Sequence, residues 1–185
     1  MEITLLRHGK PNISHRRWLS AYSFSHWVES YNLASLSENS NPPISAIEHA
    51  SNCKAVICSE LVRSTESSIK LQKNKITLSS AMFNEAGLPI AKWKFIKLPP
   101  KLWAIFFRVL WIFGYSNNSE SFSEAKLRAT ESANKLIALA QEYEKVLFIG
   151  HGVYNRILSR KLIEAGWSGE RTPSAKHWGF SVYTL

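Results

Sequence analysis

Short apolar segments alternate along the chain with longer segments in which apolar residues recur at helical spacing. The apolar segments have strand length at residues 2–6, 55–58 and 145–149, and residues 179–185 alternate like a further strand. Helices are predicted at residues 16–36, 44–51, 61–72, 101–113, 120–144 and 153–165. Strands that alternate with helices indicate a layered α/β domain.

Two of the predicted helices have apolar residues that indicate which side faces the protein core. In the helix at 16–36, the aromatic residues near helical spacing are Trp18, Tyr22, Trp27 and Tyr31. We interpret this stripe as a core-facing side rather than a ligand site. In the helix at 120–144, the expected buried residues are Leu127, Leu136, Ile137, Leu139 and Ala140.

Polar side chains stand where three predicted strands end. The first strand runs into Arg7-His8-Gly9, and the strand at 145–149 runs into Gly150-His151-Gly152. In open α/β sheets, ligands bind beyond the carboxyl ends of the strands. Arg63 follows the strand at 55–58 and falls in the first turn of the next helix, where free N–H groups favour phosphate. An anion site is therefore expected at this sheet edge; a surface salt bridge is the weaker interpretation of Arg63.

Charge and composition narrow the chemistry. The chain has 185 residues and a formal net charge of +9, which suits an anionic ligand or surface but also an ordinary basic protein. All 14 acidic residues are glutamate, so the sequence has no aspartate nucleophile, no aspartate-rich metal cluster and no aspartate for a Ser-His-Asp triad. Phosphoryl chemistry in this chain would have to use histidine, arginine and glutamate.

The cysteines and the distribution of apolar residues indicate in which cellular compartment the protein is expected. Cys53 and Cys58 lie close in sequence at the start of a strand, and we expect them to be reduced, buried or half-buried thiols of a cytoplasmic protein. Met1 leads directly into the first strand, so no signal peptide is expected. No segment offers the roughly 20 apolar residues of a membrane span.

Four motifs in sequence order resemble those of the histidine phosphatase superfamily, which includes the cofactor-dependent phosphoglycerate mutases. They are Leu6-Arg7-His8-Gly9, the segment 58–66, Asn84-Glu85-Ala86-Gly87 and Ile149-Gly150-His151-Gly152, with a softer match over 119–128. Residues 10–50 and 88–118 match poorly. The resemblance implies one phosphoglycerate mutase-like domain over 1–185, a three-layer α/β/α domain with a mostly parallel central sheet and a variable insertion at about 88–118.

The resemblance also implies roles for the site residues. His8 would attack phosphorus and form a phosphohistidine, while Arg7, Arg63 and His151 would hold the phosphoryl oxygens. Glu85 would protonate the leaving oxygen and later take a proton from water. His8, Glu85 and His151 form the expected catalytic set, and no metal or cofactor is expected. Pro11 and Ser14 stand where many members carry threonine and asparagine.

Several functions remain open. The main prediction is a phosphatase that hydrolyses a small or amphipathic phosphate monoester, with no nucleic-acid partner. The alternatives are a phosphoglycerate-mutase-like phosphotransferase, a protein-phosphohistidine phosphatase, or a non-catalytic module that binds phosphate, a membrane or a partner. His15, His26 and His49 are expected on surfaces or helix faces, while His177 could approach a pocket. No cysteine-histidine spacing supports zinc.

Residues 88–113 combine seven large aromatic residues with five cations, and no acid occurs between Glu85 and Glu120. The predicted helix at 101–113 is apolar on nearly every side, so it should be buried in the core, in a partner or at a bilayer surface. One interpretation is a substrate cover in which Trp103 and Phe107 line the pocket. The other is a structural helix buried in the domain or in a dimer seam. A membrane-surface or homodimer contact through 101–113 is the corresponding partner prediction.

Overall fold

The structure, a computed structural model, describes residues 1–14 and 18–185, so the prediction for His15 falls outside it. A five-stranded sheet forms its centre, with strand order β4-β3-β6-β1-β7. The strands are β1 (Glu2–Arg7), β3 (Ala55–Cys58), β4 (Leu78–Ser79), β6 (Lys145–Gly150) and β7 (Phe180–Thr184). All pairings are parallel except β7 on β1, so the predicted mostly parallel sheet is confirmed.

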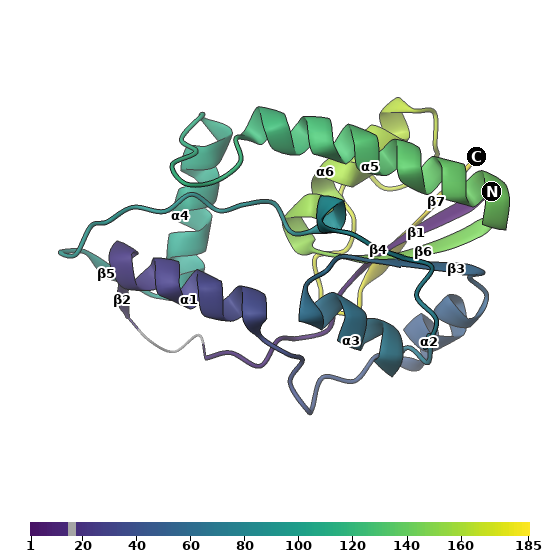
Figure 1. The fold of residues 1–185 in the computed structure, drawn as a ribbon, viewed down its shortest axis with the longest axis horizontal. Coiled ribbons are helices and arrows are strands. Elements are labelled where there is room, and N and C mark those ends of the chain that lie inside the picture. The colour runs from purple at the N-terminus through teal and green to yellow at the C-terminus, as the bar shows by residue number, and fades with distance from the viewer. Residues whose placement is uncertain (15–17) are drawn as a thin grey trace.

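Helices cover both faces of this sheet (Figure 1). One face carries α5 (Phe122–Tyr143) and α6 (Gly152–Glu164), and the other carries α2 (Ile44–Ser51) and α3 (Val62–Lys70). Successive residues of β6 point into opposite layers: Val146 and Phe148 pack under α5 and α6, whereas Leu147 and Ile149 belong to the other core cluster. The three-layer α/β/α fold predicted for the chain is therefore confirmed.

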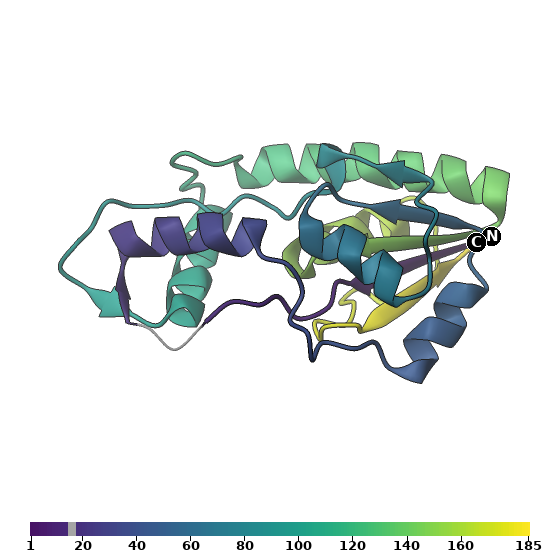
Figure 2. The ribbon, with the colours of Figure 1, turned by 60° about the horizontal axis from the view of Figure 1, so that its bottom comes forward.

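A lobe extends from one end of the sheet and joins two segments far apart in sequence (Figures 1 and 2). It contains α1 (Ala21–Leu33) and α4 (Pro100–Ile112), and its small sheet pairs β2 (Leu19–Ser20) with β5 (Lys97–Leu98). Phe24 of α1 stacks on Phe107 of α4, with ring centroids 5.9 Å apart, and Trp103 is stacked 5.4 Å from Phe107. The lobe thus has an apolar core of its own, separate from the two clusters of the sheet.

Two of the predicted buried faces are wrong in part. On α1 the buried residues are Ala21 and Phe24, whereas Trp18 and Tyr22 of the aromatic stripe are exposed. The helix begins only at Ala21, after β2, so Trp18 lies outside the helix and is not part of its face. On α5, Leu127 is exposed because the buried face runs through small residues such as Ala125 and Ala129.

Local signals account for the helix ends that frame the site. Ser121 and Glu124 form a reciprocal capping box at the start of α5, which satisfies two backbone N–H groups that the helix leaves unpaired. After α6, Gly166 adopts a φ of +92°, a conformation that glycine reaches without steric cost.

Within the described residues, no helix combines the length and apolar character needed to cross a membrane. Cys53 and Cys58 are buried free thiols.

Candidate active site

The sheet register brings the two strand-end histidines together. Arg7 of β1 pairs with Gly150 of β6 in a parallel ladder, so the next residues, His8 and His151, emerge side by side. Their ring centroids lie 5.0 Å apart. Strand β3 lies on the other side of β6 and delivers Ser59, whose hydroxyl oxygen is 2.7 Å from His151 Nε2. The sequence-predicted cluster at the carboxyl edge of the sheet therefore forms.

His8 is held as a neutral imidazole with a defined tautomer. Its Nδ1 lies 2.7 Å from the Gly9 carbonyl oxygen, and since a carbonyl only accepts, Nδ1 carries the proton. Nε2 accepts from Arg63 Nε at 3.3 Å. Burial lowers the pKa of His8 well below its ordinary value, and nearby His151 and Arg63 lower it further. The Nε2 lone pair is consequently available for nucleophilic attack.

Three buried donors surround this histidine without a protein partner. Among the residues that the structure describes, Arg7 Nε, Arg63 Nη2 and His151 Nδ1 are buried nitrogen atoms that make no hydrogen bond. A buried donor left unpaired costs about 1–3 kcal/mol, so a cluster of them is characteristic of a site that accepts an anion. Arg63 is fully buried, which excludes the surface salt bridge considered from the sequence.

Other atoms of the two arginines are fixed by backbone carbonyl groups. Arg63 Nη1 donates to the carbonyl oxygens of Tyr31 at 3.0 Å and Asn32 at 3.3 Å, at the end of α1. Arg7 Nη1 donates to the carbonyl oxygen of Ala175. These bonds leave Arg63 Nη2 and Arg7 Nε as the unpaired donors. These unpaired donors could not be identified from the sequence, because the backbone carbonyls that hold the other nitrogens belong to every residue type.

His151 completes the cluster through Ser59. Burial lowers the pKa of His151 well below its ordinary value, and Arg63 and Arg7 lower it further, so this ring is also neutral. The Ser59 oxygen accepts from Leu61 N at 3.3 Å, which leaves its hydroxyl proton to donate to His151 Nε2. In that arrangement the imidazole proton resides on Nδ1, the unpaired atom.

Glu85 reaches the same region and caps α6. One carboxylate oxygen accepts from Tyr154 N at 2.8 Å and from Ala86 N at 2.9 Å, and the other accepts from Val153 N at 3.2 Å. A negative group at this position satisfies the free N–H groups of the helix start and complements its dipole. The prediction that Glu85 lies with the strand-end residues agrees with this geometry, since Glu85 and Arg7 border one cavity.

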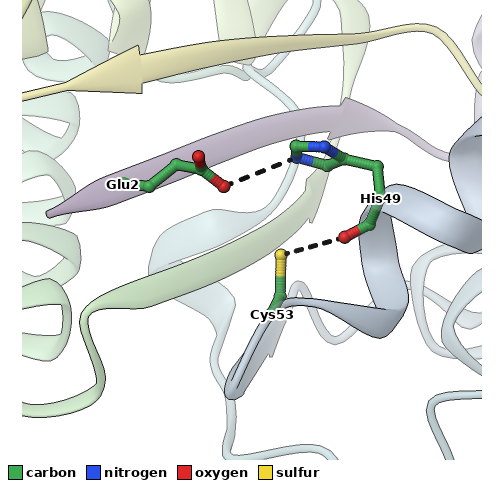
Figure 3. Close-up of side chains that lie close together, drawn as sticks. All are labelled: Glu2, His49 and Cys53. Carbon is green, nitrogen blue, oxygen red and sulfur yellow. Dashed lines mark hydrogen bonds and ion pairs between the residues drawn. The ribbon is translucent and has the colours of Figure 1, made fainter.

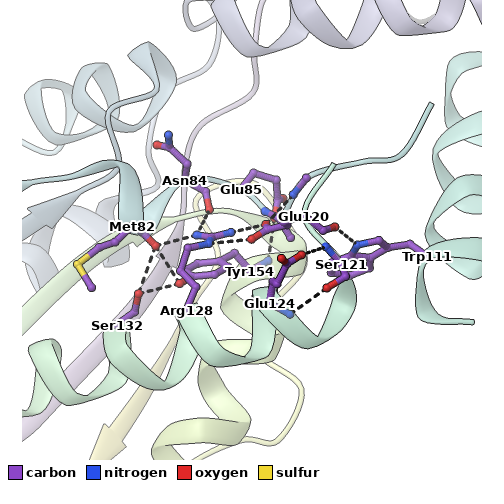
Figure 4. Close-up of polar contacts among 12 residues, drawn as sticks. Met82, Asn84, Glu85, Trp111, Glu120, Ser121, Glu124, Arg128, Ser132 and Tyr154 are labelled. Carbon is purple, nitrogen blue, oxygen red and sulfur yellow. Dashed lines mark hydrogen bonds and ion pairs between the residues drawn. The ribbon is translucent and has the colours of Figure 1, made fainter. Parts of the chain in front are cut away.

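Two arginines hold the loop that carries Glu85. Arg128 donates to the carbonyl oxygens of Met82 at 2.7 Å and Asn84 at 3.0 Å, and it forms an ion pair with Glu120 (Figure 4). From the opposite side, Arg108 of α4 donates to the carbonyl oxygens of Gly87 at 2.6 Å and Ala86 at 2.8 Å. The sequence did not suggest this role for either arginine. The one hint was the presence of Arg108 within a predicted helix, 101–113, that is otherwise apolar on nearly every side.

The cavity beside this cluster has a volume of about 820 Å³. It lies between α1, α4 and the sheet edge, with Arg7, Glu85 and His177 on its border. His177 Nδ1 lies 3.0 Å from the His8 carbonyl oxygen, so His177 does approach the pocket. Trp103 and Phe107 do not line the cavity: they are buried in the core of the lobe, which corrects their prediction as cover residues.

A second polar cluster, at the opposite end of β1, was considered as a metal centre. Ligand atoms of Glu2, His49 and Cys53 lie within 4.8 Å of one another (Figure 3). His49 Nε2 is already 2.7 Å from Thr4 Oγ1, and Cys53 Sγ faces the His49 carbonyl oxygen. Burial raises the pKa of the Cys53 thiol to about 11, and the protonated thiol is a poor metal ligand. The donor set does not fit a zinc ion well.

Solved structures with this architecture come from several phosphatases. A mycobacterial glucosyl-3-phosphoglycerate phosphatase in complex with VO3 superposes with a TM-score of 0.62 at 17% identity, over 98% of this chain and 91% of that one. The protein histidine phosphatase SixA with tungstate gives 0.54 at 13% identity, over 100% and 88%. A putative α-ribazole-5′-P phosphatase from Escherichia coli gives 0.55 at 16%, over 89% and 79%.

No family model matches the sequence, and no curated protein matches it. The fold is therefore established by the architecture rather than by overall sequence similarity. The parallel sheet and its two helical layers superpose on these neighbours over most of both chains. The chain has the phosphoglycerate mutase-like α/β/α fold that it shares with these phosphatase structures.

Proposed function

We propose that this protein is a phosphatase that hydrolyses phosphate monoesters through a phosphohistidine on His8. The observation that carries the proposal is the set of three buried, unpartnered donors around a neutral imidazole. Arg7 Nε, Arg63 Nη2 and His151 Nδ1 would each meet a phosphoryl oxygen and offset its negative charge. The VO3 and tungstate complexes of two structural neighbours contain oxyanions of similar charge and shape.

The proposed reaction has two steps. His8 Nε2 attacks phosphorus, the bond from phosphorus to the ester oxygen breaks, and protonated Glu85 gives its proton to the departing alcohol. Water then attacks phosphorus and gives a proton to Glu85, the phosphorus–nitrogen bond breaks, and inorganic phosphate leaves. The donors hold the phosphoryl group in line in both steps. No step uses a metal ion or a cofactor, so a chelator is expected to leave turnover unchanged.

The first experiment replaces the nucleophile. We expect His8→Ala to abolish turnover of p-nitrophenyl phosphate and to abolish labelling by a ³²P-labelled ester. Labelling is measured after a denaturing alkaline quench, because phosphohistidine is labile in acid. The matched control is His26→Ala, which removes an exposed histidine of α1. Near-normal turnover in His8→Ala would rule out the phosphohistidine mechanism.

The second experiment tests the general acid. Glu85→Gln should reduce turnover of alkyl phosphates roughly 100- to 10,000-fold, the usual range for general acid catalysis, and should affect p-nitrophenyl phosphate much less. The phenolate leaves without a proton, so only poor leaving groups need the acid. Equal losses on both substrates would instead indicate that Glu85 acts only as the cap of α6.

The product distinguishes hydrolysis from phosphoryl transfer. A phosphatase releases inorganic phosphate in a one-to-one ratio with the alcohol, even when a second alcohol is present as acceptor. A phosphoglycerate-mutase-like transferase would release less phosphate than alcohol under the same conditions. A non-catalytic phosphate-binding module would bind vanadate without forming either product.

A further inference from the structure

The cavity beside the phosphate site is much larger than a phosphate group requires. Its volume of about 820 Å³ falls in the range of pockets that enclose drug-sized ligands, roughly 300–1,000 Å³. Arg7 and Glu85 border it on the side of the candidate site, so a phosphoryl group on these residues would direct its alcohol into this space. The alcohol part of the substrate would therefore contact the cavity walls, and their chemistry would determine which esters bind.

Those walls are two helix faces with regular spacing. On α1 the lining residues are Phe24, Trp27, Val28 and Tyr31, which follow the i, i+3, i+4, i+7 pattern of one face. On α4 the face that contains Ala104, Ile105, Val109 and Ile112 lines the cavity. The other face of α4, with Trp103, Phe107 and Trp111, is buried, so the helix has one face for structure and another for the cavity.

Most of the residues on the two helix walls are apolar. The polar side chains of these walls belong to Tyr31 and Asn32 of α1 and to Lys101 and Arg108 of α4, and both terminal nitrogens of Arg108 already donate to backbone carbonyls. A hydroxyl group buried against Val28, Ile105 or Val109 would lose its hydrogen bonds to water without replacement. An alkyl chain or an aromatic ring in the same place gains from leaving water.

We propose that the substrate is a phosphate monoester of a bulky apolar alcohol, with its hydrocarbon part held between α1 and α4. The proposal rests on the proposed phosphatase function and specifies its substrate class. Such an ester can be a dissolved molecule or a lipid within a bilayer; the recognised chemistry, a monoester phosphate on a hydrocarbon body, is the same.

The test is a series of straight-chain alkyl monophosphates from butyl to decyl, assayed below their critical micelle concentrations. The value of kcat/KM should rise roughly two- to four-fold with each methylene until the cavity is filled, as expected for burial of one CH₂. Glycerol phosphate and glucose 6-phosphate should be poor substrates. The longest ester is also assayed in neutral vesicles, and faster turnover there than below the micelle concentration assigns the substrate to a lipid source.

A pair of substitutions on α4 separates the cavity from general effects. Ile105→Asn changes a cavity residue that is 52% exposed, and Leu102→Asn changes one that is 48% exposed and outside the cavity. Ile105→Asn should lower the decyl-to-butyl ratio of kcat/KM at least five-fold, whereas Leu102→Asn should leave the ratio at the wild-type value. Val109→Asn is a second cavity variant with the same expected effect.

The possible outcomes test the apolar substrate class separately from the proposed phosphatase function. Hydrolysis of small esters with no dependence on chain length, or equal ratios in the Ile105→Asn and Leu102→Asn variants, overturns the apolar substrate while the phosphatase function stands. Absence of both turnover and His8 labelling with every ester in the series overturns the phosphatase function itself.

A separate surface, at the tip of the lobe, supports a second inference. Phe95 is 98% exposed and Ile96 is 57% exposed, between the exposed Lys94 and Lys97. The tip lies at the end of the lobe farthest from the sheet, beside β5 (Figures 1 and 2). Apolar side chains projecting among lysines, with no acid nearby in sequence, have the composition of segments that enter the headgroup region of anionic membranes.

We infer that residues 92–97 bind an anionic lipid bilayer. This moves the membrane contact expected at 101–113 to the loop that precedes α4. Wild-type protein should sediment with vesicles of phosphatidylcholine and 30% phosphatidylglycerol, and not with pure phosphatidylcholine. The double variant Phe95→Ser/Ile96→Ser should lose at least five-fold in affinity, whereas Leu33→Ser, an exposed leucine elsewhere on the lobe, should not.

Equal sedimentation of the double variant and the wild type would overturn this inference. So would a concentration-dependent dimer that the same double variant abolishes, combined with no vesicle binding, because the tip would then be a contact between two copies of the chain. Turnover of a small ester in the variants shows that each remains folded.

Discussion

The ion pair between Arg128 and Glu120 is expected to place Glu85 as well as to stabilise the fold. The guanidinium group of Arg128 contacts the carbonyl oxygens of Met82 and Asn84, and it lies over the Tyr154 ring with 4.2 Å to the centroid. Arg128→Met removes all of these contacts and leaves the carboxylate and two carbonyl groups with fewer partners. The loop that carries Glu85 would then keep the two hydrogen bonds from Arg108 but lose those from Arg128 to its backbone.

The burial of the Arg128–Glu120 pair determines how much stability Arg128→Met should cost. Removing one partner of a fully buried pair costs about 3–5 kcal/mol, and exposed pairs contribute about 0–1 kcal/mol. The side chains of Arg128 and Glu120 are 21% and 22% exposed. For such a mostly buried pair we expect Arg128→Met to lower the free energy of unfolding by about 2–4 kcal/mol. Gly87 N still donates to Glu120, which keeps the loss below the upper limit.

Urea unfolding measures this loss, and Lys54→Met is the matched control. Lys54 pairs with Glu144, but these side chains are 58% and 69% exposed, so its loss should stay below about 1 kcal/mol. The double variant Glu120→Gln/Arg128→Met should be less destabilised than Arg128→Met, because no charge is left without its partner. A loss in Arg128→Met no larger than in Lys54→Met would refute the reasoning.

The kinetic readout separates positioning from stability alone. If Arg128 positions Glu85, the folded Arg128→Met variant should lose more activity on alkyl phosphates than on p-nitrophenyl phosphate, as Glu85→Gln does. Equal losses on the two substrates, at a temperature where the variant is folded, would assign Arg128 a structural role only.

Two further predictions concern the lobe and pH. Trp103→Ala should cost about 3–5 kcal/mol in urea unfolding, because the indole is buried and donates to the Leu19 carbonyl at 2.7 Å; a loss below about 1 kcal/mol would contradict its place in the core. The free energy of unfolding should fall as pH drops below about 6.5, since the unfolded chain protonates His8 and His151 there while their lowered pKa values keep them neutral in the folded protein. His8→Asn should show a smaller fall, and an unchanged pH dependence would argue against a buried neutral His8.

The order of apolar and amphipathic segments was enough to predict the sheet and the edge at which the polar cluster lies. Short apolar segments that alternate with helices predict interior strands of a mostly parallel sheet, and side chains that follow such strands meet at one edge. The sequence alone therefore groups His8, Arg63 and His151, and the structure places His8 against both Arg63 and His151. Glu85 does not directly follow a strand, because a short helical turn separates it from β4, and only its place in the order of motifs suggested it.

The surroundings of that cluster follow from the packing of the lobe and not from any local sequence pattern. The α1 and α4 helices both carry apolar residues on several sides, so periodicity could not tell the face that packs in the lobe from the face that lines the cavity. Of the two interpretations of the helix at 101–113, the cover is wrong for Trp103, which is buried in the lobe as the structural interpretation expects, and Ile105 was not identified as a cavity residue. The unpaired donors were equally hidden, because whether a buried nitrogen has a partner depends on backbone carbonyls such as those of Tyr31 and Asn32, which the fold alone brings within reach.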